Sequence, residues 1–152
     1  MKSDVLSIIM NCIKRETSGE RNRPYVIAID GRCAAGKTTL GGKLAEKLGC
    51  SVIHMDHFFL RPGQRTKERM EEPGGNIDYE RFREEVLLPL REGRKFAYRI
   101  FDCRKMDFHG ESVIKRAEFL IVEGAYCCRP DFLPYWDITV FLDVSKEEQL
   151  RR

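Results

Sequence analysis

The chain has 152 residues and a mass of 17.7 kDa, a size that suits one domain. Its 42% hydrophobic and 34% charged residues are typical of a globular protein and exclude disordered and collagen-like classes. The net charge of +3 is too small to indicate nucleic-acid binding by itself, although it suits an anionic ligand. No apolar run approaches the ~20 residues of a membrane span, and the N-terminal segment lacks a signal-peptide pattern, so we expect neither a membrane partner nor secretion.

The chain contains an even number of cysteines, which in a short secreted protein would suggest disulfides. Here there is no secretion signal and no pair with zinc-ligand spacing. We therefore expect reduced, mostly buried thiols in a cytoplasmic protein. The cysteines are Cys12, Cys33, Cys50, Cys103, Cys127 and Cys128.

The first third of the chain alternates between helical and strand patterns. Apolar residues at helical spacing predict a helix over Val5–Ile13, and the continuous apolar run Tyr25–Ile29 predicts a strand buried on both faces. Helical spacing returns over Thr38–Leu48, and Gly49 stands where a C-cap glycine belongs. Ser51–Met55 is predicted to be a second short strand.

The middle of the chain contains a long polar segment followed by a helix. Arg61–Asn76 is rich in Pro, Gly and charged residues and is predicted to be a loop, which at this length is usually functional or mobile. Asp78 is expected to cap a helix that runs to about Arg91, with Pro89 straining its end.

The remaining elements are a hairpin, two strands and the start of a helix. In chain order they are Lys95–Cys103 paired with Glu111–Ile114 through Gly110, then strands Phe119–Val122 and Ile138–Val144, then a helix from Ser145. Strands that alternate with helices indicate an α/β fold with a parallel sheet. Ligands of such sheets bind beyond the carboxyl ends of the strands, so the residues that follow each strand are the candidates for function.

One strand-to-helix connection matches the phosphate-loop pattern G-x-x-x-x-G-K-[ST], and the next residue is Thr39. Its glycines let successive backbone N–H groups face one anion, and the helix that follows adds its positive dipole end. A lysine at the seventh position would contact the β- and γ-phosphates, and the hydroxyl after it can bind Mg²⁺. The alternative is a glycine-rich turn that binds nothing. The loop is Gly31, Arg32, Cys33, Ala34, Ala35, Gly36, Lys37 and Thr38.

Two acids follow other predicted strands at the same edge of the sheet. Asp56 could accept a proton from an attacking hydroxyl or hold Mg²⁺ through water, and its alternative role is to cap a turn. Glu123 ends a hydrophobic strand, which is the Walker B arrangement that holds Mg²⁺ or its waters. Asp143 is interpreted as structural.

Two histidines flank Asp56. If the strand alternation continues, His54 shares a side with Asp56, and His57 points to the other side. Both histidines are interpreted as structural or rim residues rather than catalysts.

Taken together, these motifs resemble the uridine kinase and phosphoribulokinase group of P-loop kinases. The resemblance implies a P-loop NTPase fold with helices on both faces of a parallel sheet, and ATP with Mg²⁺ as cofactors. It also implies that Asp56 is the base facing the acceptor hydroxyl, that Asp78 contacts ribose hydroxyls, and that Phe101 and Asp102 line the nucleoside site. The motifs are Gly36–Thr39, Asp56–Phe59, Asn76–Asp78, Ile100–Asp102 and Glu123–Gly124.

The chain departs from that group in two places. Phe101 stands where nucleoside kinases usually have Tyr, and the chain stops at Arg152, where the group continues into a lid with arginines and a last strand. We therefore expect residues 1–152 to be one P-loop kinase domain that lacks its C-terminal part. An unpaired sheet edge would also favour self-association.

The expected function is an ATP-dependent kinase acting on a hydroxyl of a small acceptor, most simply a nucleoside such as uridine. Two alternatives stay open at this point. One is a P-loop kinase for another acceptor, such as a riboside or cofactor precursor, and the other is a nucleotide-binding module without catalysis.

Overall fold

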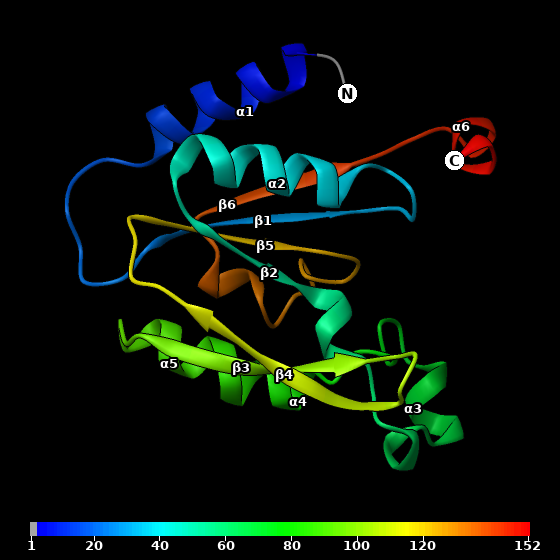
Figure 1. Ribbon diagram of the computed structural model, residues 1–152. Coiled ribbons are helices and arrows are strands. Elements are labelled where there is room, and N and C mark those ends of the chain that lie inside the picture. Colours follow the sequence, from blue (N-terminus) through cyan, green and yellow to red (C-terminus); the bar gives the residue numbers. More distant parts are fainter. Residues whose placement is uncertain (1–2) are drawn as a thin grey trace.

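Four parallel strands form the centre of the computed structural model, which describes residues 3–152 (Figure 1). Their order across the sheet is β2-β5-β1-β6. They are β1 (Tyr25–Gly31), β2 (Ser51–His54), β5 (Phe119–Glu123) and β6 (Ile138–Leu142). Met1 and Lys2 lie outside the described residues. They belong to the N-terminal segment in which we expected no signal peptide. The predicted parallel α/β sheet is confirmed.

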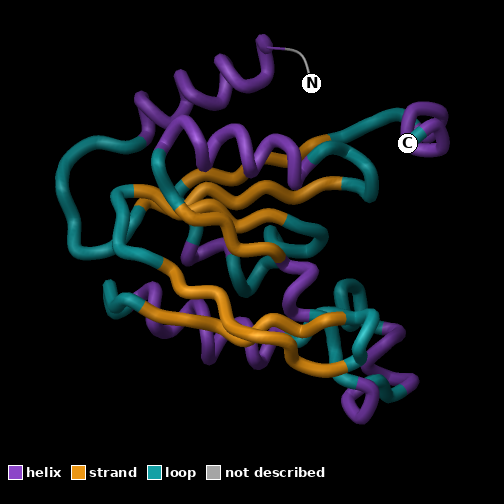
Figure 2. Tube along the Cα trace, in the orientation of Figure 1, coloured by secondary structure: helices purple, strands orange, loops and turns teal. Residues whose placement is uncertain are grey.

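Both faces of the sheet are covered, as the continuous apolar run of β1 predicts. Ile27 and Ile29 pack against α1 (Ser3–Glu16) and α2 (Lys37–Leu48), whereas Val26 and Ala28 face a second core on the opposite side. Helices accordingly lie on either side of the strands (Figure 2). α2 ends at Gly49, whose left-handed backbone forms the expected C-cap.

A composite helix covers the second face. It consists of α4 (Tyr79–Phe82), a π-helical turn (Arg83–Leu87) and α5 (Leu88–Arg91). Asp78 caps it as predicted, since its side chain accepts a hydrogen bond from the backbone N–H of Arg81 at 3.2 Å. The π turn accommodates Pro89, which has no N–H for an α-helical bond.

The hairpin of β3 (Phe96–Asp102) and β4 (Asp107–Ile114) packs on the same side, but its turn was wrongly predicted at Gly110. The chain reverses over Cys103–Met106 instead. Gly110 lies within β4 with φ +78, where the pairing register shifts opposite Arg99 and Phe101. The glycine therefore permits a β-bulge rather than a turn.

The segment Arg61–Asn76, expected to be a loop, is more ordered than predicted. It contains a 3-10 helix (Pro62–Gln64) and α3 (Lys67–Glu71). Arg69 fixes the segment by donating to the carbonyl oxygens of Gly75 and Ile77 and pairing with Glu80. In this segment, hydrogen bonds from side chains to the backbone take the place of the backbone hydrogen bonds of a long helix or a sheet.

Shorter elements complete the chain. The strand predicted at Ser51–Met55 ends one residue early, because Met55–Phe58 form a 3-10 helix. Another 3-10 helix spans Leu133–Tyr135, and α6 (Lys146–Arg151) begins after Ser145, whose hydroxyl caps it as expected. Among residues 3–152, no helix has the length and apolar character needed to traverse a bilayer.

Candidate active site

The connection from β1 to α2 forms a concave loop that glycines make possible. Gly36 has φ +93 and begins α2, and Ala34 also takes a left-handed conformation at φ +60. A Cβ on Gly31 would lie 2.2 Å from the carbonyl oxygen of Leu142 on β6, so only glycine fits there. The first turn of α2 has no side-chain cap, which leaves its N–H groups free to receive an anion.

Lys37 folds back over this loop. Its Nζ donates to the carbonyl oxygens of Gly31 at 2.9 Å and Arg32 at 2.8 Å. The exposed side chain of Arg32 pairs with Asp143 at 3.0 Å. The ammonium group of Lys37 is thus held at the mouth of the loop, where a phosphate would lie.

An open cleft of about 560 Å³ adjoins the loop. Loop residues 33–39 form one wall, Asp56 and Phe59 another, and Asn76–Ile77 and Glu123–Ala125 complete it with Arg152. Lys37, Thr38, Asp56 and Glu123, which lie far apart in the sequence, therefore line the same cavity. The carboxyl ends of parallel strands bring them together.

Glu123 is the buried centre of a polar network in the cleft. Its Oε1 accepts a hydrogen bond from the Thr38 hydroxyl at 3.3 Å and lies 2.5 Å from Nδ1 of His54. A carboxylate only accepts, so Nδ1 of His54 is the donor. Carboxylate and hydroxyl oxygens are the ligands that Mg²⁺ prefers, so Thr38 and Glu123 fit the predicted metal site.

Two glycines allow this network to pack closely. A Cβ on Gly41 of α2 would lie 3.4 Å from Cγ of Glu123, and a Cβ on Gly124 would lie 2.5 Å from Cβ of Met55. Gly124 also has φ +135. Gly124 therefore requires a residue without a Cβ, whereas Gly41 lets α2 pack in van der Waals contact with Glu123.

The predicted placement of the two histidines on opposite sides is wrong. The chain leaves the extended conformation at Met55, so the strand alternation stops and the His54 and His57 rings meet, with centroids 5.3 Å apart. Nδ1 of His57 lies 3.0 Å from the Tyr98 hydroxyl. Burial and the neighbouring His54 lower the pKa of His57, which favours its neutral form.

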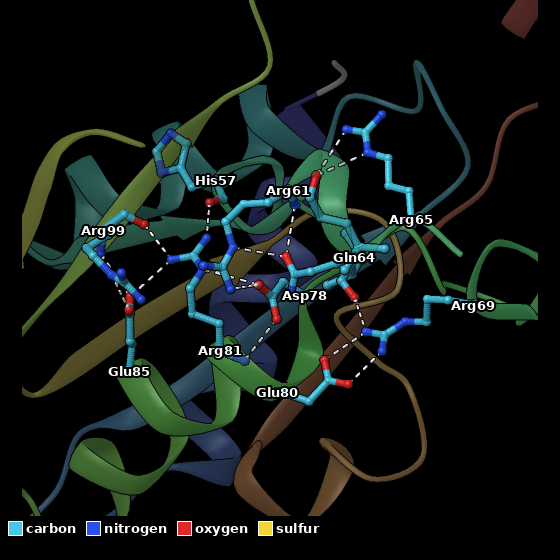
Figure 3. Close-up of polar contacts among 12 residues, drawn as sticks. His57, Arg61, Gln64, Arg65, Arg69, Asp78, Glu80, Arg81, Glu85 and Arg99 are labelled. Carbon is cyan, nitrogen blue, oxygen red and sulfur yellow. Dashed lines mark hydrogen bonds and ion pairs between the residues drawn. The ribbon is translucent and has the colours of Figure 1, made fainter. Parts of the chain in front are cut away.

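Asp78, the predicted ribose contact, lies outside the lining of this cleft. Its side chain is 2% exposed, and its Oδ2 has no hydrogen-bond partner within the described residues. This oxygen lies 3.9 Å from Arg61 and 3.7 Å from Nε of Arg81 (Figure 3). Asp78 therefore lies beside two guanidinium groups rather than in the lining of the cleft.

Arg81 is a central residue of this region that the sequence analysis did not single out. Its guanidinium donates to the carbonyl oxygens of His57 and Arg99 and pairs with Glu85 at 3.0 Å (Figure 3). These bonds join α4, the 3-10 helix after β2, and β3. An arginine within an otherwise ordinary polar helix face gives no sequence signal of such a role.

The structure does not bring Phe101 and Asp102 to the lining of the cleft. Phe101 is buried against Phe108, with ring centroids 6.2 Å apart. Asp102 accepts a hydrogen bond from the backbone N–H of Arg104 at 2.8 Å, which lowers the pKa of its carboxyl group. Their proposed contacts with an acceptor remain predictions.

Comparisons with known proteins agree with this architecture. The family model of shikimate kinase matches residues 33–92. A Pyrococcus furiosus protein, provisionally named an adenylate kinase, is 50% identical over 38 residues, which cover 25% of this chain and 21% of that protein. This chain therefore matches only about a fifth of the length of that curated relative.

Solved structures match over more of the chain. A "Possible Uridine Kinase" from Bacillus stearothermophilus has a TM-score of 0.75 at 22% identity, covering 97% of this chain and 84% of that chain. A provisionally named fructose transport system kinase from Silicibacter sp. TM1040 has a TM-score of 0.75 at 21% identity, covering 95% and 77%. D-glycerate 3-kinase from Cryptococcus neoformans var. grubii has a TM-score of 0.57 at 18% identity, covering 80% and 51%. The chain has the P-loop kinase fold, as the predicted resemblance implied.

Proposed function

We propose that residues 1–152 form a P-loop kinase domain that transfers the γ-phosphoryl group of ATP to a hydroxyl of a small acceptor. The observation that supports this most directly is the convergence of Lys37, Thr38, Asp56 and Glu123 on one cleft. A module that only binds phosphate would not need both acids there. A cytoplasmic location is part of the proposal and is supported by the free thiols of all six cysteines.

The phosphate loop and its neighbours would hold the nucleotide. Backbone N–H groups of the loop and of the first turn of α2 would receive the phosphates, and Lys37 would exchange its two loop carbonyls for phosphate oxygens. Thr38 and Glu123 would hold Mg²⁺, which when bound neutralises phosphate charge.

Asp56 would orient the acceptor. Its exposed carboxylate lines the cleft from the 3-10 helix that follows β2, so it can accept the proton of an attacking hydroxyl. Phosphoryl transfer has a loose transition state, so positioning and charge stabilisation matter more than the strength of this base.

A nucleoside such as uridine is the acceptor we favour. Support comes from the sequence resemblance at Asp56, Asp78 and Glu123 and from the similarity to the possible uridine kinase. The matches to shikimate, adenylate and D-glycerate kinases support a second candidate, a kinase of the same fold for a different hydroxyl acceptor.

An acceptor panel tests the proposal. ADP formation from Mg–ATP is measured with uridine, cytidine, fructose, D-glycerate, shikimate and AMP, and uridine is expected to give the largest acceptor-dependent rate. Turnover with another member of the panel would favour the second candidate, and no turnover with any member would contradict a kinase for these acceptors.

The variant Asp56→Asn tests the chemical step. It keeps the shape of the side chain but removes the carboxylate, so the rate should fall about 10²–10⁴-fold while ATP affinity is retained. Asp4→Asn, an exposed residue on α1, is the matched control and should have the parent rate. A parent rate in Asp56→Asn would remove Asp56 from the mechanism.

A further inference from the structure

The loop that follows β5 contains two adjacent cysteines that the proposed kinase reaction does not use. Cys127 is fully buried and Cys128 is half-buried, and their Sγ atoms are 4.0 Å apart. Both sulfur atoms lie within 4.8 Å of a carboxylate oxygen of Asp30, the residue before the phosphate loop. Within residues 3–152 this is the one cluster of three potential metal-binding side chains.

Asp30 is held in place by the backbone. Its Oδ1 accepts N–H bonds from Gly31 at 2.7 Å and Tyr126 at 3.1 Å, and its Oδ2 accepts one from Cys128 at 2.9 Å. The residue is 8% exposed, and none of the ion pairs found within residues 3–152 involves it. A buried carboxylate balanced only by amide dipoles favours a nearby cation.

The spacing of the two thiols matches a single ion. Two thiolates about 2.3 Å from a tetrahedral ion lie about 3.8 Å apart, close to the 4.0 Å observed. The rest of the loop is also fixed. The indole N–H of Trp136 donates to the carbonyl oxygen of Cys127 at 2.8 Å, and the backbone N–H of Gly124 donates to the carbonyl oxygen of Ile29 at 3.0 Å. These bonds hold the two thiols beside Asp30, with the three potential ligand atoms within 4.8 Å of one another.

We propose that Cys127, Cys128 and Asp30 form a binding site for a thiophilic divalent cation of the Zn²⁺ and Cd²⁺ class. The site is distinct from the Mg²⁺ donors Thr38 and Glu123, which offer oxygen alone. On binding, the two Sγ–H bonds break, two protons pass to water, and two metal–sulfur bonds form without any oxidant. Soft thiolate ligands select such ions over Mg²⁺, which prefers oxygen.

The hydrogen bond between the thiols supports this chemistry. It lowers the pKa of Cys128 and, together with burial, raises that of Cys127. An ion at this position would join the loop after β5 to the end of β1. Its binding should therefore stabilise the folded protein.

Titration with Cd²⁺ in the absence of nucleotide tests the site. The exposed thiols are first removed by Cys33→Ser and Cys103→Ser, which prevents adventitious binding. Thiolate-to-metal charge-transfer absorbance should saturate at one ion per chain, and Cd²⁺ should raise the melting temperature. Mg²⁺ at the same concentration should do neither.

In this background, Cys128→Ser should weaken Cd²⁺ binding about 10–100-fold or more and remove the thermal shift. Cys12→Ser, which replaces another half-buried thiol, is the matched control and should bind Cd²⁺ like the parent. Cys127→Ala provides a second ligand variant, and circular dichroism verifies the fold of each. Parent-like affinity in both ligand variants, or no charge-transfer absorbance at one equivalent, would refute the site.

Discussion

Among single residues, Lys37 is the side chain on which the nucleotide site depends most directly. Its Nζ donates to two loop carbonyls, and its side chain belongs to neither hydrophobic core of residues 3–152. Lys37→Ala should therefore abolish turnover and weaken ATP binding while leaving the melting temperature close to that of the parent. Calorimetric ATP titration and thermal denaturation measure the two effects, and an unchanged turnover rate would contradict the assignment.

His54 offers a second test at this scale, because it acts on the proposed metal site through Glu123. Its Nδ1 donates to the carboxylate oxygen that also accepts from Thr38. His54→Leu should raise the Mg²⁺ concentration needed for half-maximal activity about 10–100-fold and weaken Mn²⁺ binding measured by electron paramagnetic resonance. His54→Asn keeps a hydrogen-bond donor near the position of Nδ1, so its Mg²⁺ requirement and its Mn²⁺ affinity should lie close to those of the parent. Equal effects of the two variants would indicate a purely steric role of His54.

At the scale of elements, Glu85 joins the composite helix to the hairpin. It pairs with Arg81 at 3.0 Å and Arg99 at 2.6 Å. Burial acts to raise the pKa of Glu85, but hydrogen bonds from Arg99 and the charges of both arginines outweigh it, so the pKa is lowered from 4.5. A lowered pKa stabilises the fold above about pH 4.5, and this contribution is lost as the pH falls through the folded-state value.

Glu85→Ala should lower the free energy of unfolding at pH 7 by up to about 3–5 kcal/mol, because Arg81 stays buried and keeps only the more distant carboxylate of Asp78, at 3.7 Å. Glu85→Gln should cost less and should flatten the acid limb of the stability curve. Urea unfolding from pH 3 to pH 7 measures both. Glu71→Gln, an exposed residue on α3, is the control, and an acid limb as steep in Glu85→Gln as in the parent would contradict the linkage.

At the scale of the whole molecule, stability depends on separate cores on the two faces of the sheet. Phe82 is fully buried in the second core, with ring centroids 4.9 Å from both Phe58 and Phe132. Phe82→Ala should lower the free energy of unfolding by about 3–5 kcal/mol, measured in urea. Ile8→Ala, on the exposed side of α1, should change the free energy of unfolding little. An equal decrease of the free energy of unfolding in the two variants would contradict a specific contribution of Phe82 to the second core.

The sequence by itself determined the local elements and the phosphate loop. Continuous apolar runs, period-3.6 patterns, capping residues and the spacing of the phosphate loop all act within a few residues of one another. The capping residues are Asp78, Ser145 and Gly49, and the phosphate loop runs from Gly31 to Thr38. Such short-range constraints leave a direct trace in the order of residue types. The parallel sheet followed from them because few topologies connect alternating strands and helices.

Only the tertiary structure decided which distant side chains meet. The His54–Glu123 bond, the Arg81 bridge and the cluster of Asp30 with Cys127 and Cys128 join segments that are 18 to 98 residues apart. The predicted turn at Gly110 was wrong because this glycine forms a β-bulge within β4. The predicted placement of His54 and His57 on opposite sides was wrong because a 3-10 helix that begins at Met55 ends the strand alternation. Long-range packing selects such irregular geometry, and no local pattern encodes it.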